Sequence, residues 1–286
     1  MAHEILLQQI VEKLNNVRGL KAIVLGGSYA SNTQRPDSDL DIGLYYAADN
    51  PLDIEQVRAI ARELHDFPDP IVTDLGGWGT WVNGGAWLTI QGQRLDFLYR
   101  DLSFVTATLD DCCNGKVISD YWQQPAYGFH NFMYCTETKI CRPLYDPEHV
   151  IDVLKAKIAV YPPLLKRAIS QNFLWDARFT HENTFKAVAR GEVYRVTGAW
   201  TRTIHCLVQV LYALNERYYL SEKRLAEDIN SFSIKPDNFL ERIYHLLGAT
   251  GTSSSQLQAS QIAVQALYDE VAILVKRELT ATISHV

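Results

Sequence analysis

The 286-residue sequence lacks the features that mark membrane and exported proteins. No apolar run approaches the ~18 residues that a membrane-spanning helix needs. The first residues, MAHEILLQQIVEKLNN, are amphipathic and have no apolar core of the kind found in signal peptides. We therefore expect a cytoplasmic protein with no membrane span.

Cysteine is scarce, and its distribution excludes two further classes. The five cysteines are Cys112, Cys113, Cys135, Cys141 and Cys206. Their odd number and irregular spacing fit neither a disulfide framework nor a zinc module, so we expect reduced and mostly structural thiols. The eight histidines are scattered, with no spacing typical of a metal-binding pair.

Positive charge is lacking in the first half of the chain. Residues 1–150 carry 11 basic and 20 acidic side chains, whereas residues 151–286 carry 16 basic and 13 acidic ones. Proteins that track a nucleic-acid backbone gain affinity by neutralising its phosphates with Lys and Arg. We therefore expect no nucleic-acid partner, and an acidic first half suits a site for divalent metal ions instead.

Helical and strand patterns alternate over the first 145 residues, which predicts a small mixed α/β domain. The predicted elements are a helix over 4–17, strands over 22–25 and 40–44, a helix over 54–64 capped by Asp53, a short strand over 71–73 and a hairpin over 86–99. In the second strand of this hairpin, Leu95, Phe97 and Tyr99 share one face, and Asp96 points to the other.

The character of the sequence changes after residue 145, because strand-like alternation becomes scarce and helical periodicity persists almost to the end. The predicted helices cover 149–159, 162–178, 182–189, 193–215, 221–230, 237–247 and 255–281. We therefore predict an α+β protein, with a small mixed-sheet domain at residues 1–145 and an all-α helical bundle at residues 146–286.

The segment 26-GGSYASNTQRPDSDLDIGLYY-46 has the strongest chemical pattern in the chain. Asp39 and Asp41 are two residues apart on a predicted strand, so their carboxylates project from one face with Cβ atoms about 7 Å apart. Mg²⁺ prefers oxygen ligands and usually takes one or two carboxylates together with substrate phosphates. The pair therefore suits a metal ion that is bound jointly with a nucleotide.

A phosphate site is predicted just upstream of this pair. Gly27 follows a strand and lets a phosphate approach the backbone amides, while the hydroxyl of Ser28 can donate to a phosphate oxygen. Asp96 supplies a third carboxylate if its strand neighbours that of Asp41. Three carboxylates facing a phosphate pocket indicate metal-assisted phosphoryl or nucleotidyl transfer.

These residues resemble a known signature. The run GSYASNTQRPDSDLDI, from Gly27 to Ile42, is similar to that of the polymerase-β-type nucleotidyltransferase superfamily, a Gly-Ser pair followed by Asp-x-Asp on the next strand. The resemblance is to its small-molecule branch, the aminoglycoside and lincosamide nucleotidyltransferases with a helical C-terminal domain. The run 92-GQRLDFLYRDL-102 resembles the strand that bears the third carboxylate of that family. Asn32 stands where many members have Gly, and Asn tolerates a left-handed backbone.

The resemblance implies a role for each matched residue. Gly27 and Ser28 would hold the phosphates of a nucleoside triphosphate, and Asp39 and Asp41 would ligate Mg²⁺. Asp96 would hold a second metal ion or act on the attacking hydroxyl. The implied reaction moves a nucleoside monophosphate, AMP from ATP, onto a hydroxyl of a small-molecule acceptor and releases pyrophosphate. The alternatives are a protein-AMPylating enzyme like certain antitoxins and a catalytically inert nucleotide-binding protein.

Basic residues of the helical part are the expected partners of the triphosphate. In similar enzymes such residues contact the nucleotide, so the candidates here are Arg195, Arg202 and Lys223. The ordinary alternative is that they belong to solvated helix faces.

Two aromatic segments are also candidates for function. Trp78, Trp81 and Trp87 flank 83-NGG-85, where packing within a hairpin is the ordinary interpretation. Stacking on a base or on the acceptor is the alternative. His130 stands out among the histidines because it lies in the aromatic segment 126-AYGFHNF-132.

Overall fold

The computed structural model describes residues 2–123 and 126–283, which form two compact units. The first unit comprises Met1–Asp111 and Asn131–Val160, and the second comprises Cys112–His130 and Tyr161–Val286. The chain therefore passes between the units more than once, and the domain boundary predicted at 145/146 stays a prediction. No helix in the described part of the chain is both long and apolar enough to span a membrane.

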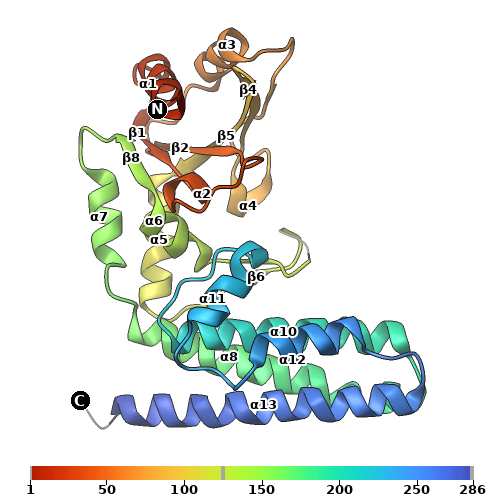
Figure 1. The fold of residues 1–286 in the computed structure, drawn as a ribbon. Coiled ribbons are helices and arrows are strands. Elements are labelled where there is room, and N and C mark those ends of the chain that lie inside the picture. Colours follow the sequence, from red (N-terminus) through yellow and green to blue (C-terminus); the bar gives the residue numbers. More distant parts are fainter. Residues whose placement is uncertain (1, 124–125, 284–286) are drawn as a thin grey trace. The chain divides into compact units, whose positions relative to one another are not determined.

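A six-stranded mixed sheet forms the centre of the first unit (Figure 1). Its strand order is β3-β4-β5-β2-β1-β8. The strands are β1 (Leu20–Leu25), β2 (Leu40–Tyr46), β3 (Ile71–Val72), β4 (Gly85–Ile90), β5 (Gln93–Asp101) and β8 (Arg142–Tyr145). β2 and β5 are parallel, and the other neighbouring strands are antiparallel.

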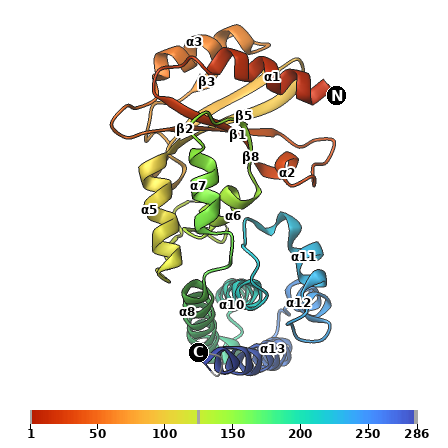
Figure 2. The ribbon, with the colours of Figure 1, turned by 90° about the vertical axis from the view of Figure 1, so that its left-hand side faces the viewer.

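One face of this sheet is covered by α1 (Ala2–Leu14) and α3 (Ile54–Leu64), as Figure 2 shows. Apolar residues at alternate positions of the strands point to this face, where they meet the apolar faces of the two helices. Asp53 caps α3, because its Oδ1 accepts a hydrogen bond from the backbone nitrogen of Gln56 at 3.2 Å. The predicted cap is confirmed. Because the apolar core occupies this face of the sheet, polar residues of the strands can lie on the opposite face.

Further helices lie on the other side of the sheet. They are α2 (Gly27–Ala30), α5 (Leu102–Cys113), α6 (Met133–Ile140) and α7 (Val150–Lys157), with α4 (Gly79–Val82) in the connection between β3 and β4. Figure 2 shows α2, α5, α6 and α7 on the side opposite to α1 and α3. The short helix α2 directly follows β1, so it places the residues of the Gly-Ser pair at the end of a central strand.

The second unit is a bundle of helices with one small hairpin. Its helices are α8 (Pro163–Glu182), α9 (Phe185–Ala189), α10 (Val193–Leu214), a 3₁₀ turn (Glu222–Arg224), α11 (Leu225–Ser231), α12 (Phe239–Gly248) and α13 (Ser254–Ile283). The hairpin consists of β6 (Ser119–Asp120) and β7 (Phe129–His130).

Helix α10 forms the core of this bundle. Every residue from Thr203 to Leu214 is buried, because this stretch is apolar nearly all round the helix. In Figure 1, α8, α10 and α13 run side by side. The predicted fold class, a mixed sheet with a helical bundle, is confirmed.

Candidate active site

The turn between β1 and α2 is shaped around Asp41. The backbone nitrogen of Gly26 donates to the carbonyl oxygen of Asp41 at 2.7 Å, which ties the turn to β2. Gly27 has φ +57°, and a Cβ atom placed on it would lie 1.8 Å from Oδ2 of Asp41. Only glycine fits at this position, because the backbone is left-handed and the carboxylate lies directly against it.

The loop after α2 is held by its own hydroxyl groups. The Ser31 Oγ lies 3.1 Å from the carbonyl oxygen of Gly27 and 3.2 Å from that of Ser28, and it donates to these oxygens. The Thr33 backbone nitrogen also donates to the Ser28 carbonyl oxygen at 2.9 Å. Asn32 has φ 55°, so the predicted left-handed residue is confirmed.

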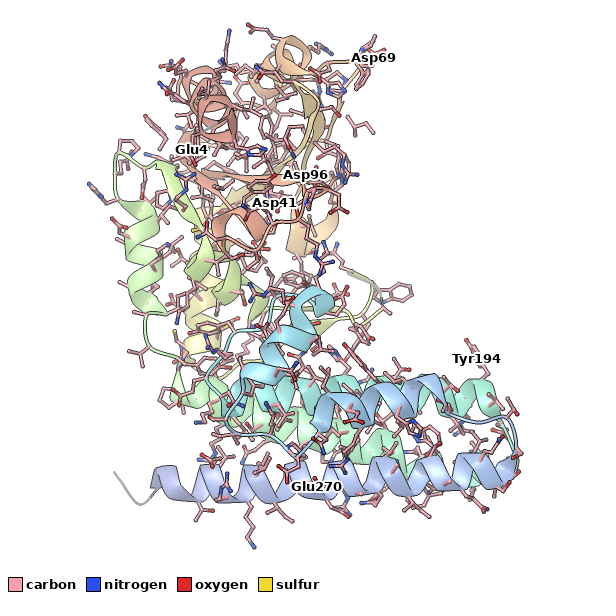
Figure 3. All side chains as sticks on the ribbon, viewed as in Figure 1. Glu4, Asp41, Asp69, Asp96, Tyr194 and Glu270 are labelled. Carbon is pink, nitrogen blue, oxygen red and sulfur yellow. The ribbon has the colours of Figure 1, made fainter. Side chains whose placement is uncertain are left out.

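The structure brings the predicted carboxylates together on the face of the sheet opposite to the apolar core. Asp41 on β2 and Asp96 on β5 are direct partners in the parallel pairing of these strands. Asp39 precedes β2 and stands two residues before Asp41, so it belongs to the same face. Figure 3 labels Asp41 and Asp96 close together in the first unit.

Arg94 is a member of this site that the sequence analysis did not single out. Its Nε lies 2.7 Å from Oδ1 of Asp39, and its Nη2 donates to the carbonyl oxygen of Asp37 at 3.0 Å. The approach to Asp39 does not have hydrogen-bond geometry, and among the described residues no donor satisfies the buried Oδ1 atom. The available signal was spacing, since Arg94 stands two residues before Asp96 on a strand and shares its face.

The electrostatics of the site reflect an excess of negative charge. Burial, reinforced by the neighbouring Asp39 carboxylate, raises the pKa of Asp96 from 3.8 to about 6, and Arg94 opposes this rise. A carboxyl group whose ionised form is disfavoured gains from an added cation. The site therefore favours the binding of a positive ion beside Asp96 and Asp39.

These residues fit Mg²⁺ that is shared with a substrate. Within residues 2–123 and 126–283, no group of three Cys, His, Asp or Glu forms a protein-only metal cage. Mg²⁺ seldom uses such a cage, because it takes one or two carboxylates and completes its shell with water and substrate phosphates. The raised pKa of Asp96 is consistent with this open arrangement.

The three basic residues predicted to contact the nucleotide belong to the second unit. Arg195 lies on α10, with its Nη1 3.7 Å from Oε2 of Glu192. Arg202 lies on α10, where its Nη2 is 3.6 Å from Oδ2 of Asp176 and its Cζ is 4.7 Å from the ring centroid of Tyr121. Lys223 lies in the 3₁₀ turn and is exposed. Their contact with a nucleotide stays a prediction.

A family comparison agrees with the site. Residues 8–73 match the family model described as Polymerase beta, Nucleotidyltransferase. The matched segment contains the Gly-Ser turn together with Asp39 and Asp41, and it ends before Asp96. Residues 8–73 thus match a nucleotidyltransferase domain of the polymerase-β type, and the predicted enzyme class, nucleotidyltransferase, is confirmed.

Two solved structures are similar to the whole chain at low identity. One is a nucleotidyltransferase-like protein from Exiguobacterium sibiricum, with 9% identity, a TM-score of 0.49, and coverage of 98% of this chain and 79% of that chain. The other is an aminoglycoside 6-adenyltransferase from Bacillus subtilis, with 11% identity, a TM-score of 0.32, and coverage of 96% and 90%. No curated protein matches the sequence.

Proposed function

We propose that the protein transfers a nucleoside monophosphate, AMP from ATP, onto a hydroxyl group of a small molecule and releases pyrophosphate. The observation that carries this proposal is the pairing of Asp41 with Asp96 on parallel strands, directly beside the Gly27 turn. This arrangement supports a site in which the carboxylates would hold a metal ion beside phosphates bound at the Gly27 turn.

The donor end of the site is the turn at Gly27 and Ser28. The first amides of a helix have no acceptor within that helix, so they can donate to phosphate oxygens. In this proposal Asp39 and Asp41 would hold the Mg²⁺, and Asp96 lies beside Asp41 on the neighbouring strand. When bound, the ion neutralises the charge of the phosphates and orients an in-line displacement.

Asp96 is the proposed base. The acceptor oxygen bonds to the α-phosphorus, the bond from that phosphorus to the β-phosphate oxygen breaks, and pyrophosphate leaves with that electron pair. The proton of the hydroxyl passes to the Asp96 carboxylate. A carboxylate with a pKa of about 6 is a better base than an ordinary aspartate and is still ionised at neutral pH. A second metal ion at Asp96 is the other role that the family resemblance implies.

Arg202 and Lys223 are proposed to bind the triphosphate. The two variants Arg202→Ala and Lys223→Ala would each weaken Mg·ATP binding, measured by isothermal titration calorimetry. Loss of one charge-assisted hydrogen bond predicts roughly a tenfold increase in Kd. An unchanged Kd in both variants would remove these residues from the nucleotide site and leave the rest of the proposal intact.

The test of the main proposal compares the wild type with Asp41→Asn. Each protein is incubated with α-labelled ATP, Mg²⁺ and a panel of hydroxylated small molecules, and both pyrophosphate and labelled acceptor are measured. Asp69→Asn is the matched control, because Asp69 is exposed on the same unit and Figure 3 shows it well away from Asp41 and Asp96.

We expect transfer in the wild type and in Asp69→Asn, with at least a roughly 100-fold loss in Asp41→Asn. Equal pyrophosphate release in the wild type and Asp41→Asn would contradict the enzyme assignment and favour an inert nucleotide-binding protein. Label that appears on protein, with none on small molecules, would favour the protein-AMPylating alternative.

A further inference from the structure

Helices α11 and α12 and the connection between them line a pocket in the second unit. The two helices lie next to each other, as Figure 2 shows. The pocket has a volume of about 640 Å³, within the range of roughly 300–1,000 Å³ that small-molecule sites occupy. The lining residues that determine its chemistry are Ile229, Lys235, Phe239, Leu240, Glu241 and Tyr244. All of them belong to the second unit, so the pocket lies within one compact body.

Lys235 supplies the positive charge of this pocket. It lies in the connection between the two helices, where its Nζ donates to the carbonyl oxygens of Ile229 and Asn230 at 2.8 Å and 2.7 Å. Both carbonyl groups belong to the last turn of α11, so the ammonium group is anchored at the end of that helix. An ammonium group has three N–H donors. One donor therefore remains for an acceptor in the pocket.

Glu241 supplies the negative charge. It lies in the first turn of α12 and is exposed. Within residues 2–123 and 126–283, its side chain forms no hydrogen bond or ion pair, and in particular none with Lys235. Two opposite charges thus line one pocket without contacting each other. A ligand that carries both charges could bridge them.

The rest of the chemically relevant lining is apolar. The side chains of Ile229 and Phe239 are 0% and 1% exposed, and Leu240 is partly buried. Tyr244 adds an aromatic ring that is 53% exposed. A hydrocarbon segment gains free energy when it leaves water for such a surface. The ligand is therefore expected to have an apolar part as well as its charges.

The two charges of the pocket disfavour ligands that carry only one sign. Glu241 repels a carboxylate or a phosphate, and Lys235 repels an ammonium group. Juxtaposed like charges lower affinity, so each residue acts against a class of wrong ligands. The polyphosphate of a nucleotide, with several negative charges, is thus a poor match for this pocket.

We propose that the pocket binds a small zwitterion that has a hydrocarbon segment between its charges. Its carboxylate accepts a hydrogen bond from Lys235, its ammonium group donates to Glu241, and its hydrocarbon segment contacts the apolar lining. An ω-amino acid has this arrangement of groups. The binding site goes beyond the proposed nucleotidyl transfer and does not depend on it.

Saturation-transfer NMR titrations of the full chain test the proposal. The probes are 6-aminohexanoate as the zwitterion, hexanoate and hexylamine as comparisons with the same chain length and a single charge, and adipate as the dianion. The proteins are wild type, Glu241→Gln and Glu241→Lys. Glu222→Gln and Glu222→Lys are the matched controls, because Glu222 is exposed in the 3₁₀ turn of the same unit and does not line the pocket.

We expect the wild type to bind 6-aminohexanoate at least about tenfold more tightly than hexanoate or hexylamine, since each of these lacks one charge-assisted hydrogen bond. Glu241→Gln should remove the preference for 6-aminohexanoate over hexanoate. Glu241→Lys should reverse the specificity, so that adipate binds and 6-aminohexanoate does not. Both Glu222 variants should match the wild type.

Three outcomes would overturn the proposal. They are equal or absent binding of the four probes by the wild type, an unchanged affinity of Glu241→Gln for 6-aminohexanoate, and a failure of Glu241→Lys to bind adipate. Reversed specificity is a readout that a merely structural role of Glu241 would not produce. If Glu241→Lys does not fold, Glu241→Gln still decides the matter. A failure of the nucleotidyl transfer would leave these expectations unchanged, because none of the pocket residues takes part in that reaction.

Discussion

The two units each contain a centre of interacting titratable groups, and the two centres differ in exposure and charge. The carboxylates of the first unit are partly exposed, and burial together with a like charge raises the pKa of Asp96. In the second unit, His130 and His205 are buried, with their Nε2 atoms 3.0 Å apart. Burial, with the charge of Arg202 as a further cause, lowers the pKa of both imidazoles below 6.5.

The difference indicates which centre does chemistry. The histidine pair satisfies itself, because one neutral imidazole can donate to the other and Ser119 Oγ lies 2.8 Å from Nδ1 of His130. Tyr127 stacks on His205 with ring centroids 4.7 Å apart, which closes the pair within an aromatic layer. The carboxylates, in contrast, have one cation close by, Arg94, whose Nε lies 2.7 Å from Oδ1 of Asp39. The contrast supports a structural role for the histidine pair and the proposed cation site at Asp39, Asp41 and Asp96, which we call the carboxylate row.

Gly27→Ala should have the largest effect on the carboxylate site. The added Cβ would meet Oδ2 of Asp41 at 1.8 Å, so the carboxylate or the turn must move. A displacement of this size in an active site lowers kcat/KM by about 100-fold or more, measured as pyrophosphate release.

Gly92→Ala is the matched control for this variant. Gly92 has φ +77°, but no atom would lie within 4 Å of its Cβ. Both substitutions carry a left-handed backbone penalty of about 1–2 kcal/mol, and only Gly27→Ala disturbs Asp41. Equal activity losses in the two variants would show that backbone strain alone matters, and the contact with Asp41 would have no catalytic meaning.

Acidification should destabilise the second unit through the histidine pair. A lowered pKa means that the unfolded chain binds protons more readily than the folded one, so stability is complete above pH 6.5 and falls as the pH drops below it. Each pH unit costs up to about 1.4 kcal/mol per titrating imidazole. The free energy of unfolding, measured by urea denaturation between pH 7 and pH 5, should fall accordingly.

A His130→Gln, His205→Gln double variant should show a flatter profile over the same range, because nothing at these positions then takes up a proton. His245→Gln is the control, since His245 is exposed on α12 of the same unit and should leave the slope unchanged. A wild-type slope retained in the double variant would locate the acid sensitivity elsewhere.

Much of the fold could be predicted from local patterns. The sequence predicted five of the six strands of the central sheet, including the hairpin ending in β5, and the long helices of the bundle, because these have clear periodicity. The edge strand β8 was not predicted. Helix α5 was not predicted, since its sequence LSFVTATLDDCC is rich in β-branched residues and has no strong polar face. The β6–β7 hairpin has two residues in each strand and depends on distant contacts, which a local pattern does not contain.

The candidate site was predictable in part for the same reason. The alternation in β5 predicted that Asp96 lies on the opposite face of the strand from Phe97. The structure places Asp96 beside Asp41, as expected. The ion pair of Arg94 with Asp39 joins residues far apart in the sequence through the parallel pairing of β2 and β5. No local pattern specifies that pairing, so Arg94 was missed. The catalytic and metal-binding roles stay predictions.

Asp96→Asn should stabilise the metal-free protein above pH 6. A raised pKa means that the folded carboxyl group holds its proton more tightly than the unfolded one, so stability falls as the pH rises from about 4 to about 6. The amide removes this cost. We expect a gain of about 1 kcal/mol at pH 8, discounted for the partial exposure of Asp96, and almost none at pH 4.

Urea denaturation of Asp96→Asn and of the exposed control Asp69→Asn, each at pH 4 and pH 8 with EDTA, measures this gain. If the free energy of unfolding of Asp96→Asn differed from that of the wild type by the same amount at both pH values, the charge of Asp96 would carry no penalty in the folded state. Only the histidine pair would then have a disfavoured charged form, and the argument that the carboxylates gain from an added cation would fail.

The smallest effect is expected from Arg94→Gln, and it tests whether the carboxylates depend on an external cation. Arg94 is the cation nearest to Asp39, and its side chain is 64% exposed, so this ion pair contributes at most about 1 kcal/mol. Removing it makes the site more negative. The Mg²⁺ concentration for half-maximal pyrophosphate release should therefore fall by roughly two- to fivefold, with Arg62→Gln on α3 as the exposed control. If the requirement for Mg²⁺ rises instead, Arg94 assists metal or phosphate binding, and the chain itself supplies part of the positive charge that the carboxylates need.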